Sequence, residues 1–139
     1  MTMGIENTLS ALNEYAWRHH VDQKVHMFAR KAADEGTDHG DKVRLIVEKL
    51  HRRFVYAPDP VKEGITSLED GHGDVEDFCW FTAACAMSIG IPCRIVGARY
   101  NKRCWTCFVA YQDEKGYWVG ADPLQQKTDH IEFEELAWS

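Results

Sequence analysis

The residues best suited to chemistry gather around one apolar stretch, residues 78–89. Three carboxylates, Asp74, Glu76 and Asp77, come just before this stretch, and Gly90-Ile91-Pro92 follows it. Apolar residues on every face predict a buried helix, which the glycine and proline terminate. Carboxylates in a first turn complement the helix dipole, and Asp74 suits the N-cap position. Capping and turn roles are therefore favoured over a general acid/base pair.

The five cysteines could supply thiol chemistry, but their spacing favours other roles. Cys79 falls one turn inside the predicted helix, where apolar neighbours raise the pKa of a thiol, so a core role is favoured. Cys104 and Cys107 have the spacing of a redox pair or half a zinc site. Residues three apart on a strand point to opposite faces, and no second ligand pair completes a tetrahedral set. We therefore expect no metal and no cofactor.

Length, charge and cysteine usage bound the class of protein. A chain of 139 residues fits a single domain over 1–139, and a net charge of −6 disfavours a nucleic-acid or anionic-membrane partner. No apolar run reaches the roughly 20 residues that span a bilayer, and the N-terminus lacks a signal-peptide pattern. An odd number of cysteines without framework spacing favours reduced thiols. We expect an intracellular, cytoplasmic protein.

Helices are predicted before the central helix and strands after it. Apolar residues recur at helical spacing, with breaks at 36–41 and 57–60, and the helical positions are Ile5, Leu9, Leu12, Val25, Phe28, Val43, Ile46, Val47 and Leu50. Alternating patterns predict three antiparallel strands at 93–100, 104–111 and 117–121. Residues 125–139 suit a strand or a helix. The expected fold is α+β, with N-terminal helices and a buried central helix packed on a small antiparallel β-sheet.

The central stretch also resembles a known family. Gly-Asp-x-Glu-Asp-Phe at 73–78, a small-residue helix and Gly-Ile-Pro-x-Arg at 90–94 are similar to the core of transglutaminase-like proteins of the phage and bacterial type, a branch of the papain-like cysteine-hydrolase fold. The resemblance is clearest over residues 40–123. It implies a Cys-His-Asp site whose nucleophilic cysteine is the first residue of the helix, where the dipole lowers the pKa of a thiol.

Two of the three implied catalytic groups are replaced in this chain. Val75 stands at the implied nucleophile position, and Asp122, in Trp-Val-x-x-Asp-Pro at 118–123, matches the aspartate. The implied histidine belongs on the strand before it, where Arg103, Thr106 and Cys107 remain open as registers and the last two are preferred. No histidine occurs between His72 and His130. The resemblance therefore implies the family fold with a degenerate triad.

The favoured function is a non-catalytic pseudoenzyme whose former cleft binds an unknown protein or peptide ligand. Trp80, Trp105 and Trp118 are candidate walls of that cleft, although burial in the core is the ordinary role of each. His72, in the loop before the helix, is a candidate contact, although loop histidines are usually solvated. His19-His20 and the acidic run Glu132, Glu134 and Glu135 are expected on solvated faces.

Two other classes of function stay open. An active cysteine amidase, peptidase or acyl transferase would require that Val75 is an introduced substitution, or that Cys79 or Cys107 has been recruited as nucleophile. The missing histidine argues against a single introduced change. The resemblance to phage-type members also allows a structural component of a phage or prophage.

Overall fold

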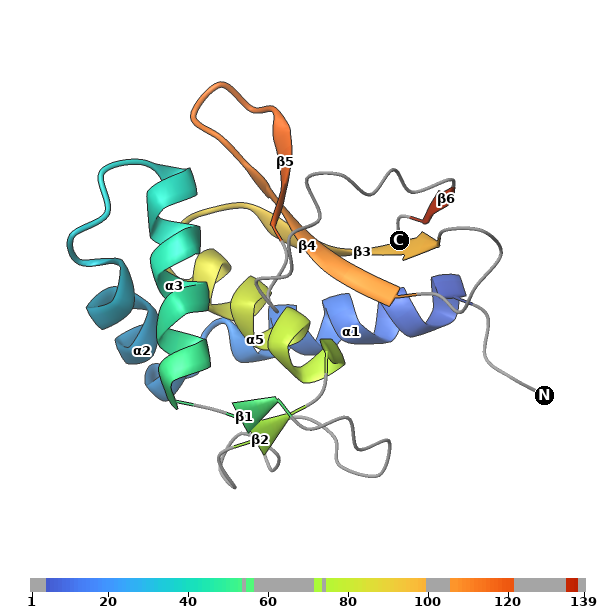
Figure 1. Ribbon diagram of the computed structural model, residues 1–139, viewed down its shortest axis with the longest axis horizontal. Coiled ribbons are helices and arrows are strands. Elements are labelled where there is room, and N and C mark those ends of the chain that lie inside the picture. Colours follow the sequence, from blue (N-terminus) through green and yellow to red (C-terminus); the bar gives the residue numbers. More distant parts are fainter. Residues whose placement is uncertain are drawn as a thin grey trace.

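The computed structural model describes residues 5–53, 55–56, 72–73, 75–99, 106–121 and 135–137. Within them, four helices pack against an antiparallel sheet of order β5-β4-β3-β6, and a two-stranded pair, β1 and β2, lies apart from it (Figure 1). The helices are α1 (Ile5–His19), α2 (Gln23–Ala33), α3 (His39–Arg53) and α5 (Val75–Ser88). None of them is long and apolar enough to cross a membrane. The expected α+β fold is confirmed.

The three N-terminal helices begin and end where local chemistry predicts. The Asp22 carboxylate accepts the Lys24 N–H at 2.7 Å and so caps α2, while Asp38 accepts the Asp41 N–H at 2.7 Å at the start of α3. Each helix turns its apolar stripe inward, and the buried members are Leu9, Ala16, Val25, Ala29, Ala33, Val43, Ile46, Val47 and Leu50. The predicted helical pattern is therefore confirmed up to Leu50; Phe54 lies outside the described residues.

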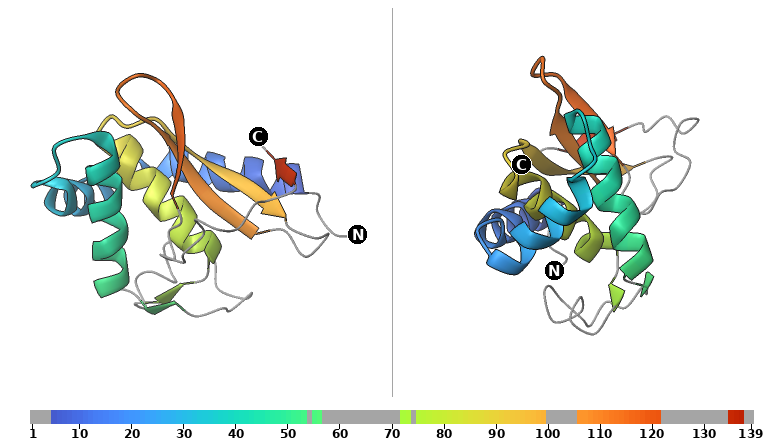
Figure 2. Two further views of the ribbon diagram at one scale, coloured as in Figure 1. Left: turned by 45° about the horizontal axis from the view of Figure 1, so that its top comes forward. Right: turned by 90° about the vertical axis from the view of Figure 1, so that its left-hand side faces the viewer.

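Helix α5 occupies the centre of the molecule. It contacts α1, α2, α3, β3 and β4, and the turned views in Figure 2 show it enclosed by these elements. Every residue from Asp77 to Ala86 is buried, as the apolar pattern predicts. Gly90 ends the helix with a φ of +86°, and the Ile91 N–H donates to the Ala86 carbonyl oxygen at 2.9 Å. This is the left-handed helix end for which glycine is favoured.

The main sheet carries the three predicted antiparallel strands. Strand β4 (Thr106–Gln112) pairs on one side with β3 (Cys93–Arg99) and on the other with β5 (Trp118–Ala121). Cys107 lies opposite Gly97 in this register. A Cβ atom added at Gly97 would lie 3.0 Å from the Ile5 side chain, so this glycine allows α1 to run close against β3.

Two short pairings add to what the sequence predicts. The backbone of His72–Gly73 (β2) pairs in parallel with Val55–Tyr56 (β1), so His72 does not lie in a loop as expected. Two-residue strands have no periodicity, which is why the sequence pattern misses them. At the C-terminal end, Glu135–Ala137 forms β6 and pairs with β3, so these three residues adopt the strand alternative.

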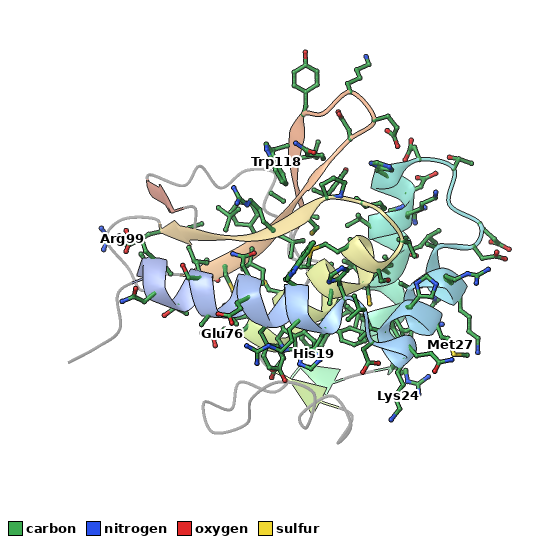
Figure 3. All side chains as sticks on the ribbon, turned by 180° about the vertical axis from the view of Figure 1, so that it is seen from behind. His19, Lys24, Met27, Glu76, Arg99 and Trp118 are labelled. Carbon is green, nitrogen blue, oxygen red and sulfur yellow. The ribbon has the colours of Figure 1, made fainter. Side chains whose placement is uncertain are left out.

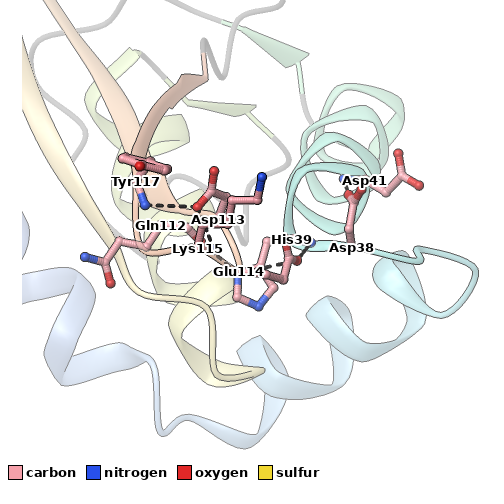
Figure 4. Close-up of polar contacts among 8 residues, drawn as sticks. All are labelled: Asp38, His39, Asp41, Gln112, Asp113, Glu114, Lys115 and Tyr117. Atoms are coloured by element: carbon pink, nitrogen blue, oxygen red, sulfur yellow. Dashed lines mark hydrogen bonds and ion pairs between the residues drawn. The ribbon is translucent and has the colours of Figure 1, made fainter.

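The N-terminus of α3 is fastened to the turn between β4 and β5 (Figure 4). The Glu114 carboxylate accepts the His39 backbone N–H at 2.6 Å, and His39 Nδ1 lies 2.7 Å from the Gln112 carbonyl oxygen. Within the turn, Asp113 accepts the backbone N–H groups of Lys115 and Tyr117, both at 2.9 Å. These contacts set the position of α3 relative to the sheet.

Candidate functional site

The first turn of α5 presents a hydrocarbon where the resemblance implies a thiol. Val75 is the first residue of α5, is partly buried and packs against the hydrophobic core. Glu76 beside it is exposed, while Asp74, the expected N-cap, lies outside the described residues. A helix N-terminus stabilises a thiolate, but an isopropyl group offers neither a nucleophile nor a proton. The side chain at the start of α5 therefore cannot act as a nucleophile.

The second turn of α5 forms a buried polar and aromatic cluster. Asp77 is only 3% exposed and accepts the Trp80 indole N–H at 3.2 Å. It is therefore a core hydrogen-bond acceptor as well as a first-turn residue. Trp80 is 1% exposed and packs edge-on against Tyr15, with ring centroids 4.7 Å apart. Burial in the core, the ordinary role for a tryptophan, holds for Trp80, which is not an exposed wall of a cleft.

His19 belongs to the same cluster and does not lie on a solvated face as expected. The centroid of its ring lies 4.3 Å from that of Tyr15 and 5.4 Å from that of Trp80. His19 is the last residue of α1 and is labelled in Figure 3. Partial burial lowers the pKa of His19, and nearby Asp22 offsets part of this effect. A pattern of two adjacent histidines between apolar positions could not show which ring turns inward.

One turn inside the helix, a thiol of α5 meets a thiol of β4. Cys79 Sγ and Cys107 Sγ lie 3.4 Å apart, and the two residues are 0% and 7% exposed. The expected burial of Cys79 is confirmed. Because strand residues alternate between faces, Thr106 points away from α5, and it is exposed. Of the two preferred registers, Cys107 is thus the one that faces the central helix.

Several predicted site residues lie outside the described residues: Arg103, Cys104, Trp105 and Asp122, together with the side chain of His72. Strand β5 ends at Ala121, directly before Asp122. Trp118 is 43% exposed and opposes Gln112 in the ladder, so it lies on the sheet face turned away from α5, with the Arg94 guanidinium 5.5 Å from its ring. A tryptophan there does not line the start of α5.

The remaining described thiols are poor nucleophiles. Burial raises the pKa of Cys85 well above its ordinary value, and the nearby Cys93 adds to this effect. Burial also raises the pKa of Cys93 to about 12. Since the thiolate is the reactive form, neither residue can serve at neutral pH. Among the described residues, no group of three or more His, Cys, Asp and Glu side chains is placed to hold a metal ion.

A small pocket lies between α3 and the sheet near the end of β5. Its volume is about 220 Å³, and it is lined by Gly40, Val43, Arg44, Val47, Tyr111, Gly120 and Ala121. The two valine side chains make part of the lining apolar, and its polar groups are the Tyr111 hydroxyl and Arg44, whose guanidinium pairs with Glu48 at 2.8 Å. An apolar pocket with a few polar groups is the usual form of a small ligand subsite.

Solved structures share this arrangement of helices and sheet. A candidate cysteine protease from Cytophaga hutchinsonii matches with a TM-score of 0.65 and 15% identity, over 83% of this chain and 42% of its own. The periplasmic domain of TgpA from Pseudomonas aeruginosa matches with a TM-score of 0.57 and 17% identity, over 84% of this chain and 49% of its own. A candidate protease from Parabacteroides distasonis matches with a TM-score of 0.59 and 19% identity, over 83% of this chain and 26% of its own. This chain thus spans less than half the length of each.

A buried central helix packed against an antiparallel sheet, with further helices around it, defines an α+β domain. A sequence profile of the transglutaminase-like superfamily matches residues 26–123, which is most of the chain. The protein belongs to the transglutaminase-like superfamily. A comparison with curated proteins finds no match.

Proposed function

We propose that this transglutaminase-like domain is non-catalytic and that its degenerate site binds a peptide segment of a protein ligand. The observation that carries the proposal is Val75 at the first position of α5, where the family resemblance implies the nucleophile. A valine side chain cannot form the acyl-enzyme bond on which thiol hydrolases and acyl transferases depend.

The strand opposite α5 supports the same conclusion. Cys107 is the β4 residue that meets α5, and its sulfur already contacts Cys79. A thiol in this position does not supply the imidazole that takes up and returns a proton in a Cys-His-Asp site. The chain contains no histidine between His72 and His130, so β4 supplies no general base.

A peptide suits the surface that remains. The pocket between α3 and β5 can receive one apolar side chain, and its lining residue Ala121 directly precedes Asp122, the implied third member of the site. The net charge of −6 disfavours a nucleic-acid or anionic-membrane partner. An odd number of cysteines without framework spacing favours reduced thiols and a cytoplasmic location.

Alkylation kinetics test the proposed loss of chemistry. In the native protein, we expect no cysteine to react with iodoacetamide at pH 7 faster than in a denatured control. Val75→Cys should add one thiol that is alkylated rapidly, because a pKa lowered by about one unit raises the thiolate fraction at pH 7 roughly eightfold. A thiolate of lower pKa is also a weaker nucleophile, so the increase in the alkylation rate should be smaller than this factor. Ser88→Cys is the matched control, since Ser88 is also partly buried but lies at the other end of α5, where the helix dipole does not stabilise a thiolate.

Hydrolysis of an activated ester by Val75→Cys should stay slow, because general-base assistance typically contributes about 10²–10⁴-fold. Rapid single-site labelling of Cys79 or Cys107 in the native protein would show a recruited nucleophile and overturn the proposal. The binding half is tested by adding unstructured peptides to isotope-labelled protein. Amide shifts should cluster on Val43, Val47, Tyr111 and Ala121; shifts scattered over the surface would contradict this half.

A further inference from the structure

The contact between Cys79 and Cys107 joins two elements that are far apart in the sequence. The residues are 28 positions apart, and their sulfur atoms lie 3.4 Å from each other. A disulfide bond is about 2.05 Å long, so the two sulfurs lie little more than about 1 Å beyond bonding distance. Both cysteines are free thiols in this structure.

We propose that Cys79 and Cys107 form a reversible disulfide that ties α5 to β4. The bond would lie one helical turn from Val75, and so would lock the helix start against the strand that faces it. This inference does not depend on the proposed function, because it concerns sulfur atoms that lie one turn deeper than the implied nucleophile position.

The oxidant is a small-molecule disulfide of the glutathione class. Cys107 loses its proton, and its thiolate attacks one sulfur of the oxidant, which forms a mixed disulfide and expels one small thiolate. Cys79 then loses its proton and attacks the Cys107 sulfur, which expels the second small thiolate. The protein gives up two electrons and two protons, and the small disulfide becomes two small thiols.

Accessibility sets the order of these two steps. Cys107 is 7% exposed and is the second residue of β4, next to the exposed Thr106, whereas Cys79 is fully buried in the middle of the core. Strand ends open more readily than the centre of a packed helix, so Cys107 meets the oxidant first. Cys79 is then the resolving thiol, because it is already in contact with the sulfur that it must attack.

Two other cysteine pairs provide internal comparisons. Cys85 and Cys93 lie close enough for their charges to interact, but burial raises the pKa of both thiols, which disfavours the thiolate needed for exchange. Cys104 and Cys107 have the spacing of a redox motif in the sequence. Cys104 lies outside the described residues, and the contact that the structure gives Cys107 is with the sulfur of Cys79.

The test maps disulfides in the native wild-type protein, which requires no substitution. Reduced protein is incubated with oxidised glutathione at pH 8, free thiols are blocked with N-ethylmaleimide in acid denaturant, and the chain is cut with chymotrypsin. Cleavage after Phe78, Trp80, Tyr100, Trp105 and Phe108 places Cys79, Cys104 and Cys107 on three separate peptides. Cys85 and Cys93 stay together on a fourth peptide, where a bond between them would block labelling by N-ethylmaleimide. The expected product links Cys79-Trp80 to Thr106-Cys107-Phe108, and it should disappear on addition of dithiothreitol.

Two further measurements examine the mechanism. Cys79→Ala should leave Cys107 as a stable mixed disulfide with glutathione, whereas Cys107→Ala should leave Cys79 unmodified. Closing a loop of this length should raise the unfolding midpoint of the oxidised wild-type protein by roughly 10 °C. A chain that stays fully reduced while folded, or a dominant link between Cys104 and Cys107 or between Cys85 and Cys93, would overturn the proposal.

Discussion

Replacing Asn13 should destabilise the fold far more than its position on a helix surface suggests. The Asn13 side chain forms a two-way bridge from α1 to β3: its Oδ1 accepts the Ile95 N–H at 2.8 Å, and its Nδ2 donates to the Ile95 carbonyl oxygen at 3.0 Å. The same Nδ2 lies 2.9 Å from the Leu9 carbonyl oxygen. Among the described residues, β6 pairs with β3 at residues 97–99, and the backbone groups of Ile95 on this side of β3 bond to Asn13.

The magnitude follows from the two backbone groups that would lose their partner. Ile95 is fully buried, and each buried polar group without a hydrogen bond costs about 1–3 kcal/mol. The higher helix propensity of alanine offsets roughly 0.5 kcal/mol of this loss in the free energy of unfolding. Asn13 is only partly buried, so water can reach one group in part. We expect Asn13→Ala to lower the free energy of unfolding by about 2–3 kcal/mol.

Urea unfolding followed by tryptophan fluorescence measures this loss. The matched control is Glu14→Ala, the next residue on α1, whose ion pair with Arg18 joins side chains that are 70% and 66% exposed. Such surface pairs contribute about 0–1 kcal/mol. If Asn13→Ala costs no more than Glu14→Ala, the bridge to Ile95 does not stabilise the fold and the reasoning is wrong.

Asn13→Asp adds a pH signature that a simple loss of packing would not produce. The ionised carboxylate would accept the Ile95 N–H, but it would also face the carbonyl oxygens of Ile95 and Leu9. Repulsion should raise the folded-state pKa of this aspartate above its unfolded value of about 3.9. The variant should then be most stable, relative to wild type, below that unfolded value, and should lose stability as the pH rises through the folded pKa.

Two further predictions concern His19 and Gly90. Burial lowers the folded-state pKa of His19, so its contribution to stability is complete above the unfolded value of about 6.5 and is lost as the pH falls through the folded pKa. The stability difference between pH 7.5 and pH 5 should shrink in His19→Phe, and an unchanged difference would contradict the packing of this ring. Gly90 has a φ of +86° and open space where a Cβ would lie, so Gly90→Ala should cost about 1 kcal/mol from backbone strain alone. Gly90→Asn should cost less in the same unfolding assay, and equal costs would point to a steric clash instead.

The sequence predicts those parts of the fold that depend on local patterns. The apolar stripe of α3, the all-apolar α5 and its Gly90 end follow from spacing and from one backbone angle. The antiparallel strands β3, β4 and β5 follow from alternation. Which residue of β4 meets which residue of α5 depends on a strand register and a helix rotation that no short window contains. That is why Thr106 and Cys107 stay equivalent in the sequence and become distinct in the structure.

Long-range polar contacts are missed for the same reason. Asn13 and Ile95 are 82 positions apart, and nothing in the sequence near Asn13 shows that the Ile95 backbone needs a partner. Trp80 illustrates a second limit, since a large aromatic residue fits either a cleft wall or a core, and only its contacts with Tyr15 and the Asp77 carboxylate decide between them.

The packing of α5 explains how the family fold can persist with a valine at the implied nucleophile position. The helix is held by α1, α2, α3, β3 and β4 through the continuous buried run from Asp77 to Ala86. None of those contacts requires a thiol at position 75, and the Val75 methyl groups add apolar packing at the edge of the core. Position 79, one turn deeper, does not tolerate a larger side chain in the same way, because such a side chain would clash with the Cys107 sulfur. The chemistry implied at the start of α5 and the stability of α5 therefore depend on different residues.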